Sequence, residues 1–140
     1  MRGRRVAATA LVAFAALLVA YVSSSPAGSD TDAATAKTIG SASTSDFRVV
    51  LTATKLEGGA APAARVTVTT SRKAGSAWRR TGVRHLAGTY FWKTLTGPRA
   101  VCRLELRTTG GATSSPRAVV QLLQTPSVGC GPQSVHSLTG

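Results

Sequence analysis

Basic and aromatic side chains are concentrated in one short stretch of the sequence. Residues 78–93 contain Trp78-Arg79-Arg80, then Arg84-His85, then Tyr90-Phe91-Trp92-Lys93. Arginine guanidinium groups form paired hydrogen bonds with phosphates and carboxylates, and aromatic rings stack on bases or sugars. We therefore nominate Trp78, Arg79, Arg80 and Arg84 as a binding site for anionic ligands. The plainer alternative is that one Trp fills the core and the arginines form the solvated face of a strand.

The overall charge agrees with an anionic partner but does not select one. The formal net charge is +12, and loss of Arg2, Arg4 and Arg5 with an N-terminal leader would still leave +9. Such a field attracts teichoic acids, anionic lipid headgroups, nucleic acids and acidic glycans alike. Charge on its own argues only for solubility and non-specific binding.

Groups that perform acid–base chemistry are few. Beyond residue 45 the carboxylates are Asp46, Glu57 and Glu105, and no two of them are spaced as a catalytic pair. A Ser–His–Asp set would need His85 with Asp46 and a serine, but no G-x-S-x-G motif nominates that serine. The glycine pairs lack the spacing of a phosphate-binding loop. We predict no catalytic residues and no cofactor, with an enzyme centred on His85 as a minor alternative.

The two cysteines, Cys102 and Cys130, are expected to form a disulfide, because an even pair in an exported protein usually does. Such a bond would attach the C-terminal tail to the sheet. Zinc bound by these cysteines with His85 and His136 is the competing interpretation. Structural zinc sites usually draw closely spaced ligand pairs from short turns, and the chain has none. We therefore predict no metal site.

The N-terminal region is typical of a secretory signal peptide. Residues 1–5 are basic, residues 6–22 are apolar or small, and Ser23-Ser24-Ser25-Pro26 ends the run. We expect cleavage after Ala27 and secretion of the remaining chain. The alternative is an uncleaved membrane anchor, with the C-terminal domain still outside.

The remaining chain divides into a spacer and one folded domain. Residues 28–45 are small and polar, which predicts a flexible spacer. Residues 46–140 contain alternating apolar and polar runs typical of half-buried strands, at 47–54, 65–72, 76–86, 89–95, 100–109 and 117–124. In the third run a β-bulge near Gly82 would restore the alternation. We predict an all-β, antiparallel, immunoglobulin-like sandwich of six to seven short strands, with an open barrel as the alternative.

Two blocks, GTYFWKTLTGPRAVCRLEL (88–106) and RAVVQLLQTPSVGCG (117–131), resemble small secreted proteins of unknown function from high-GC Gram-positive bacteria. The resemblance implies a signal peptide, a spacer, a short β-domain and a late cysteine pair. It implies no catalytic residues. The likeness to immunoglobulin sandwiches rests on the strand count, because Trp78 precedes both cysteines instead of lying between them.

The expected function is that of a non-catalytic module that binds anionic envelope or extracellular polymers, such as those of the cell wall, through its basic surface. The alternative is a small secreted inhibitor of a hydrolase, which would present residues 73–80 or 96–99 from a disulfide-linked scaffold. A membrane is expected as a partner only through an uncleaved leader. The sequence does not define an oligomeric state.

Overall fold

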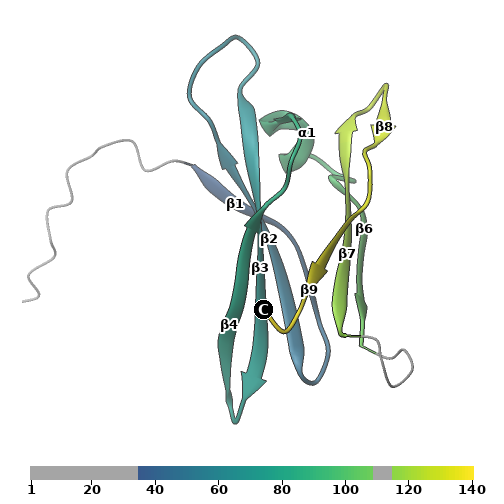
Figure 1. The fold of residues 1–140 in the computed structure, drawn as a ribbon. Helices are drawn as coiled ribbons and strands as arrows, with labels where there is room; N and C mark the ends of the chain where they lie inside the picture. Colours follow the sequence, from purple (N-terminus) through teal and green to yellow (C-terminus); the bar gives the residue numbers. More distant parts are fainter. Residues whose placement is uncertain (1–34, 109–114) are drawn as a thin grey trace, which may run out of the picture. The chain divides into compact units, whose positions relative to one another are not determined.

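The computed structural model describes residues 35–108 and 115–140. The predicted signal peptide lies outside the described residues. The first sheet contains β1 (Ala36–Ser43), β2 (Phe47–Lys55), β3 (Ala63–Ala74) and β4 (Ala77–His85) in that spatial order, all antiparallel (Figure 1). A short strand, β5 (Tyr90–Phe91), pairs with the beginning of β3.

The second sheet is built around one central strand. Its strands are β6 (Val101–Arg107), β7 (Arg117–Thr125), β8 (Gly129–Cys130) and β9 (Ser134–Ser137), and β7 pairs antiparallel with each of the others. The all-β, antiparallel, two-sheet prediction is confirmed. The described residues form nine strands instead of six or seven, and those outside the predicted runs are β1, β8 and β9.

Alternation along the longer strands produces the core. In β2 the residues Phe47, Val49, Leu51 and Ala53 are buried while Arg48 is exposed. Since successive side chains in a strand point to opposite faces, each strand presents one apolar face to the other sheet. Both sheets contribute to one buried cluster, which contains Phe47, Val49, Leu51, Ala53, Ala64, Val66, Val68, Tyr90, Leu95, Ala118, Val120, Leu122 and Leu138.

The predicted flexible spacer is wrong for residues 36–43, which form β1 at the edge of the first sheet. This strand pairs with β2 from Ala36 opposite Thr54 to Ser43 opposite Arg48, with an irregularity at Ile39. Ile39 packs against the core. A strand that is held by backbone hydrogen bonds to a neighbour needs little apolar surface of its own, so the small, polar composition was misleading.

The predicted strand over residues 89–95 is also wrong beyond Phe91. The chain leaves β3 there and forms a single helical turn, α1 (Trp92–Thr96), which contacts β2 and β7. This turn places Leu95 in the core and lets Trp92 pack against it. One turn is too short to show a helical repeat of apolar residues, whereas the aromatic and β-branched composition favours a strand.

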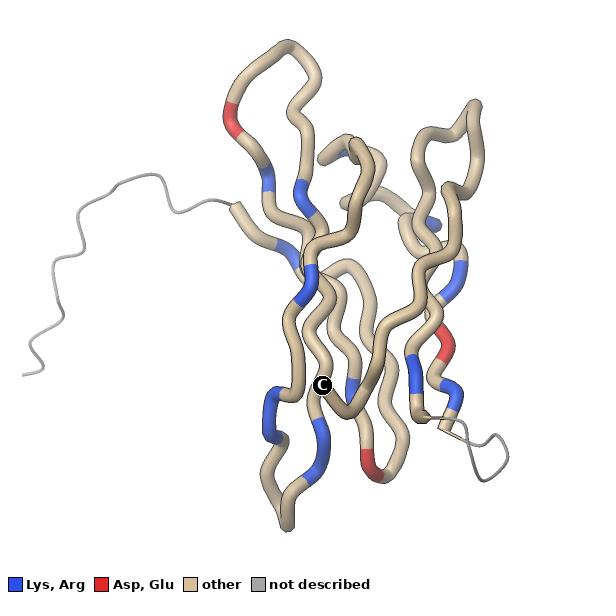
Figure 2. Tube along the Cα trace, in the orientation of Figure 1, with Lys and Arg blue, Asp and Glu red and all other residues tan. Residues whose placement is uncertain are grey.

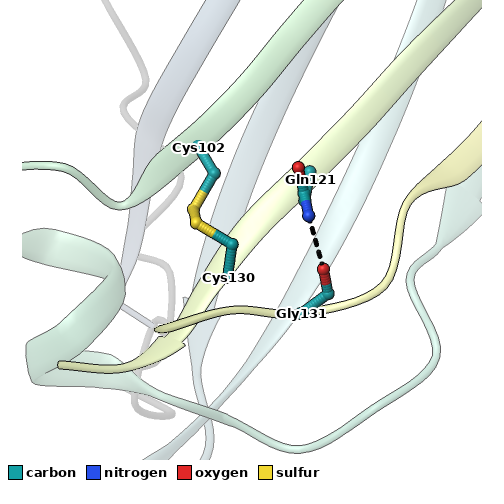
Figure 3. Close-up of a disulfide and its surroundings, with 4 residues drawn as sticks. All are labelled: Cys102, Gln121, Cys130 and Gly131. Carbon is teal, nitrogen blue, oxygen red and sulfur yellow. Dashed lines mark hydrogen bonds between the residues drawn. A yellow bond between two sulfur atoms is a disulfide. The ribbon is translucent and has the colours of Figure 1, made fainter. Parts of the chain in front are cut away.

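The predicted Cys102–Cys130 disulfide is confirmed (Figure 3). It joins β6 to β8, two strands that both pair with β7. Beside it, the amide of Gln121 donates a hydrogen bond to the carbonyl of Gly131 at 2.8 Å. The segment that follows β7 is therefore attached to the second sheet by a covalent bond and by hydrogen bonds.

Candidate basic–aromatic surface

Trp78 lies on the outer face of the first sheet, away from the core. Its side chain is half-buried, and it is not part of the core cluster. The guanidinium carbon of Arg48, two strands away on β2, lies 4.4 Å from the centre of the Trp78 ring. This distance is typical of a cation–π contact. The ring and the guanidinium group therefore hold each other in place on the surface.

The register of the sheet brings further cations to the same face. Arg48 on β2 lies opposite Ser71 on β3, which in turn lies opposite Arg80 on β4. Lys73 on β3 lies opposite Trp78. Residues that are directly opposite in a ladder point to the same side of a sheet. We call the four residues Arg48, Lys73, Trp78 and Arg80 the outer patch.

No carboxylate of the described residues forms an ion pair with the outer patch. The ion pairs in this part of the chain are those of Glu105 with Arg103 and Arg107, on the second sheet. Hydrogen bonds from Arg107 and Arg103 lower the pKa of Glu105. Asp46, in the turn before β2, accepts a hydrogen bond from the Ser45 hydroxyl at 3.0 Å and forms no ion pair with the outer patch. Basic residues are spread over the strands of the first sheet, while the acidic ones lie in its turns (Figure 2).

The structure does not bring all four nominated residues together. Trp78 and Arg80 belong to the outer patch, whereas Arg79 and Arg84 are on the inner side of β4, opposite Arg72 and Val68 respectively. Arg79 is on the inner side by the ordinary alternation of the strand, whereas the predicted bulge near Gly82 explains the position of Arg84. The register shifts between the pairs Thr70–Gly82 and Ser71–Arg80, which leaves Thr81 as the additional residue.

The second aromatic group, at residues 90–93, is far from Trp78. Tyr90 lies opposite Ala64 and Trp78 lies opposite Lys73, nine positions further along β3. At about 3.3 Å per residue this separation is about 30 Å. Tyr90 is buried in the core, which raises its pKa, and its hydroxyl donates a hydrogen bond to the Ala87 carbonyl. The aromatic cluster in the sequence is therefore not one surface.

Arg48 and Lys73 were missed at the sequence level because they lie on strands other than that of Trp78. The alternation of β2 places Arg48 outside, and the turn residues Gly75-Ser76 close the β3–β4 hairpin so that Lys73 faces Trp78. Gly75 has a φ of +65°, a conformation that glycine adopts readily. A hairpin register derived from this turn would have found Lys73. To identify Arg48 on β2 as a neighbour of Trp78, the order and register of all the strands of the sheet must be known.

The groups considered for catalysis are also separated. His85 lies opposite Thr67, whose hydroxyl is 3.1 Å from the imidazole Nδ1. The Asp46 carbonyl accepts from the backbone N–H of Lys73, six positions further along β3 than Thr67, or about 20 Å away. Both cysteine thiols are used in the disulfide. No group of three or more metal-binding side chains occurs in residues 35–108 and 115–140.

No family model, curated protein or solved structure matches this chain. In the part of the chain that the structure describes, no helix has the length and apolar character needed to cross a membrane. The disulfide fits an oxidising, extracellular environment.

Proposed function

We propose that this domain is a non-catalytic binding module whose outer patch holds anionic sugar–phosphate polymers of the cell envelope. The observation that carries the proposal is the Arg48–Trp78 contact at 4.4 Å, within a group of cations that form no ion pair with any carboxylate of the described residues. A guanidinium group stacked on an indole keeps its N–H edge available for phosphate or carboxylate. The exposed part of the ring offers a surface on which a sugar or base can stack.

The spread of the outer patch over several strands suits an extended polymer. Its residues come from three neighbouring strands of one sheet, at similar positions along the ladder. Neighbouring strands are spaced by about 4.8 Å, so the cations are distributed over roughly 10–15 Å. A chain with repeated phosphates can contact several of them at once. Such contacts give affinity that falls steeply with salt.

Charge removal tests the proposal. We expect the triple variant Arg48→Gln, Lys73→Gln, Arg80→Gln to lose most of its affinity for purified teichoic acid at low salt. With a single-stranded oligonucleotide as a comparison probe, the slope of log K against log salt should become shallower by about two units. The matched control Arg65→Gln, Lys93→Gln, Arg117→Gln removes the same charge from exposed positions elsewhere. The proposal fails if both triple variants lose binding equally.

The ring is tested separately. Because Trp78 lies outside the core, Trp78→Ala should keep the circular dichroism spectrum and the unfolding transition while weakening teichoic acid binding at an unchanged salt slope. Trp78→Phe should recover part of the affinity. Unfolding of Trp78→Ala, or unaltered binding by it, would remove the ring from the proposal.

Export is the remaining part of the proposal, supported by the disulfide and by the apolar N-terminal run. N-terminal sequencing of the protein from the culture medium should start near Gly28. Recovery of the chain only from membranes with Met1 retained would favour an anchored form, still outside the cell.

A further inference from the structure

The free edges of β4 and β9 enclose a pocket on the inner side of the sandwich. It has a volume of about 330 Å³ and is lined from the first sheet by Val68, Thr70, Thr81, Gly82, Arg84 and His85, and from the C-terminal segment by Val135, His136, Ser137 and Gly140. In Figure 1 the C-terminus lies beside β4. This volume is at the lower end of the range for small-ligand sites, which suits one anionic group with a small substituent.

The bulge residue Thr81 shapes this pocket. Its hydroxyl donates a hydrogen bond to the carbonyl of Leu138 at 2.8 Å, and it lies 3.0 Å from the hydroxyl of Thr70. These contacts join the edge strand of the first sheet to the segment that follows β9. After the bulge, Arg84 lies on the inner side of β4. The same irregularity that removes Arg84 from the outer patch therefore places it at the pocket.

His136 is held in one orientation by Ser134. The Ser134 hydroxyl donates to the carbonyl of Val120 at 3.3 Å, and the imidazole Nε2 lies 3.0 Å from the same hydroxyl oxygen. A hydroxyl has one hydrogen, so with that hydrogen donated to Val120 the imidazole Nε2–H is the donor to Ser134. In the neutral ring Nδ1 is then unprotonated, and protonation of His136 creates a new N–H donor at Nδ1.

The charged side chains around the pocket are all basic, and the one anionic group beside them is the α-carboxylate of Gly140. Arg84 and His85 line it from β4 and His136 lines it from β9, and none of the lining side chains is a carboxylate. Arg84 forms no ion pair with any described residue. Hydroxyl groups of Thr70, Thr81 and Ser137 complete the polar lining. This combination of donors is the kind that binds oxyanions.

We infer that this pocket binds a small oxyanion, a carboxylate or phosphate group, between Arg84 and protonated His136. The site is separate from the outer patch, since it lies on the opposite face of β4 and on the second sheet. It does not depend on polymer binding. A polymer end, a modified sugar or a free anion could each supply the chemical group.

Binding at this pocket is expected to depend on pH. Burial lowers the pKa of His136, and the positive charge of Arg84 lowers it further. An oxyanion between these two groups offsets the positive charge of Arg84 and stabilises the charged imidazole, so it raises that pKa. By linkage, the affinity for the oxyanion increases as the pH falls through the pKa of His136. Above that pKa His136 is neutral, and of the two residues only Arg84 still carries a positive charge.

The test follows the imidazole Cε1–H signal of His136 by NMR as a function of pH, in the intact folded protein. Sodium acetate and inorganic phosphate are the two probes, with chloride at equal ionic strength as the reference. Near neutral pH phosphate changes its own charge whereas acetate does not, so in that range the effect of acetate carries no contribution from titration of the probe. We expect both anions to raise the pKa of His136, with a larger effect for the oxyanion class the pocket prefers.

Variants assign the effect to the pocket. In Arg84→Gln the affinity for either anion should fall about tenfold or more, as expected for loss of a charge-assisted hydrogen bond. The matched variant Arg65→Gln removes the same charge from the exposed outer side of β3 and should behave as wild type. A chain extended by a neutral Gly-Ser tail moves the terminal carboxylate away from Gly140 and should keep the response.

Several results would overturn the inference. One is that neither anion raises the pKa of His136. Another is that Arg84→Gln and Arg65→Gln lose anion affinity equally. The third is that the pKa of His136 no longer rises with anion in the chain extended by the Gly-Ser tail. The outer-patch triple variant should retain the response of His136. The failure of polymer binding and the failure of oxyanion binding can therefore be told apart.

Discussion

The two sheets of this domain differ in how they are stabilised and in what they present to solvent. The first sheet has four long or medium strands in a continuous ladder, and its outer face carries the outer patch without ion pairs among the described residues. The second sheet relies on short strands around β7, a disulfide, and an Arg103–Glu105–Arg107 cluster that neutralises part of its face. Covalent and ionic stabilisation is thus on one sheet, and uncompensated charge is on the other.

This difference suggests a division of roles. One edge of the second sheet is formed only by the short strands β8 (Gly129–Cys130) and β9 (Ser134–Ser137). This edge gains little from its own ladder, so a cross-link adds a large share of its stability. The first sheet does not need such support and can keep like charges on one face. The predictions below alter each of these features, beginning with the largest expected effect.

Removal of the disulfide should have the largest effect. Closing a loop with a sequence separation of 28 residues stabilises a domain by about 3–4 kcal/mol in the chain-entropy model. The double variant Cys102→Ser, Cys130→Ser should therefore lose about 2–5 kcal/mol in urea unfolding. Reduced wild-type protein is the control and should unfold at a similar urea concentration. An unchanged midpoint would show that the second sheet does not depend on the cross-link.

Gly40 tests how closely the edge of the first sheet approaches the second. A Cβ at this position would lie 3.0 Å from the Cγ2 of Val101 on β6. Gly40→Val should overpack this contact and cost about 1–3 kcal/mol in the free energy of unfolding. Ser41→Val, on the opposite face of the same strand, should change stability by less than about 0.5 kcal/mol. Equal effects of the two substitutions would contradict close packing at this edge.

Thr81 connects the other edge of the first sheet to the C-terminal segment. Thr81→Val keeps the shape of the side chain but removes its hydrogen bond to the Leu138 carbonyl, at a cost of about 1 kcal/mol. Amide hydrogen exchange in β9 should increase at the same time. Thr69→Val on the outer face of β3 is the control, and its exchange in β9 should match wild type. If Thr81→Val leaves exchange in β9 unaltered, the two edges are held together by other contacts.

Glu105→Gln should have the smallest effect on stability. It removes the ion pairs that distinguish the second sheet from the first. Because the folded-state pKa of Glu105 is lowered, its contribution is present above its unfolded-state pKa and is lost as the pH falls through the folded-state value. The difference between variant and wild type in urea unfolding should therefore disappear in acid. The substitution also frees Arg103 and Arg107, so teichoic acid binding at low salt should become stronger. Weaker teichoic acid binding by this variant would contradict the expectation, because it would mean that the paired arrangement of Arg103 and Arg107 around Glu105 itself supports binding.

Much of the fold followed from local patterns in the sequence. The alternation of Phe47, Val49, Leu51 and Ala53 predicts a strand with one buried face, and this strand is β2. The additional residue near Gly82 was also visible locally, because Trp78, Arg80, Gly82 and Arg84 cannot share one buried face. The strand β1 was not visible, since its pairing with β2 uses backbone groups that every residue carries.

The sequence by itself determined the β-class, the disulfide, the basic character and the bulge, because these depend on period-two alternation, composition and the spacing of neighbouring residues. Only the tertiary structure decided which cations share a surface. It joined Arg48 to Trp78 across two strands, moved Arg84 to the inner side beside His136, and separated Tyr90 from Trp78. The physical reason is that strand register and sheet packing arise from contacts between residues far apart in the chain. No local pattern records these contacts.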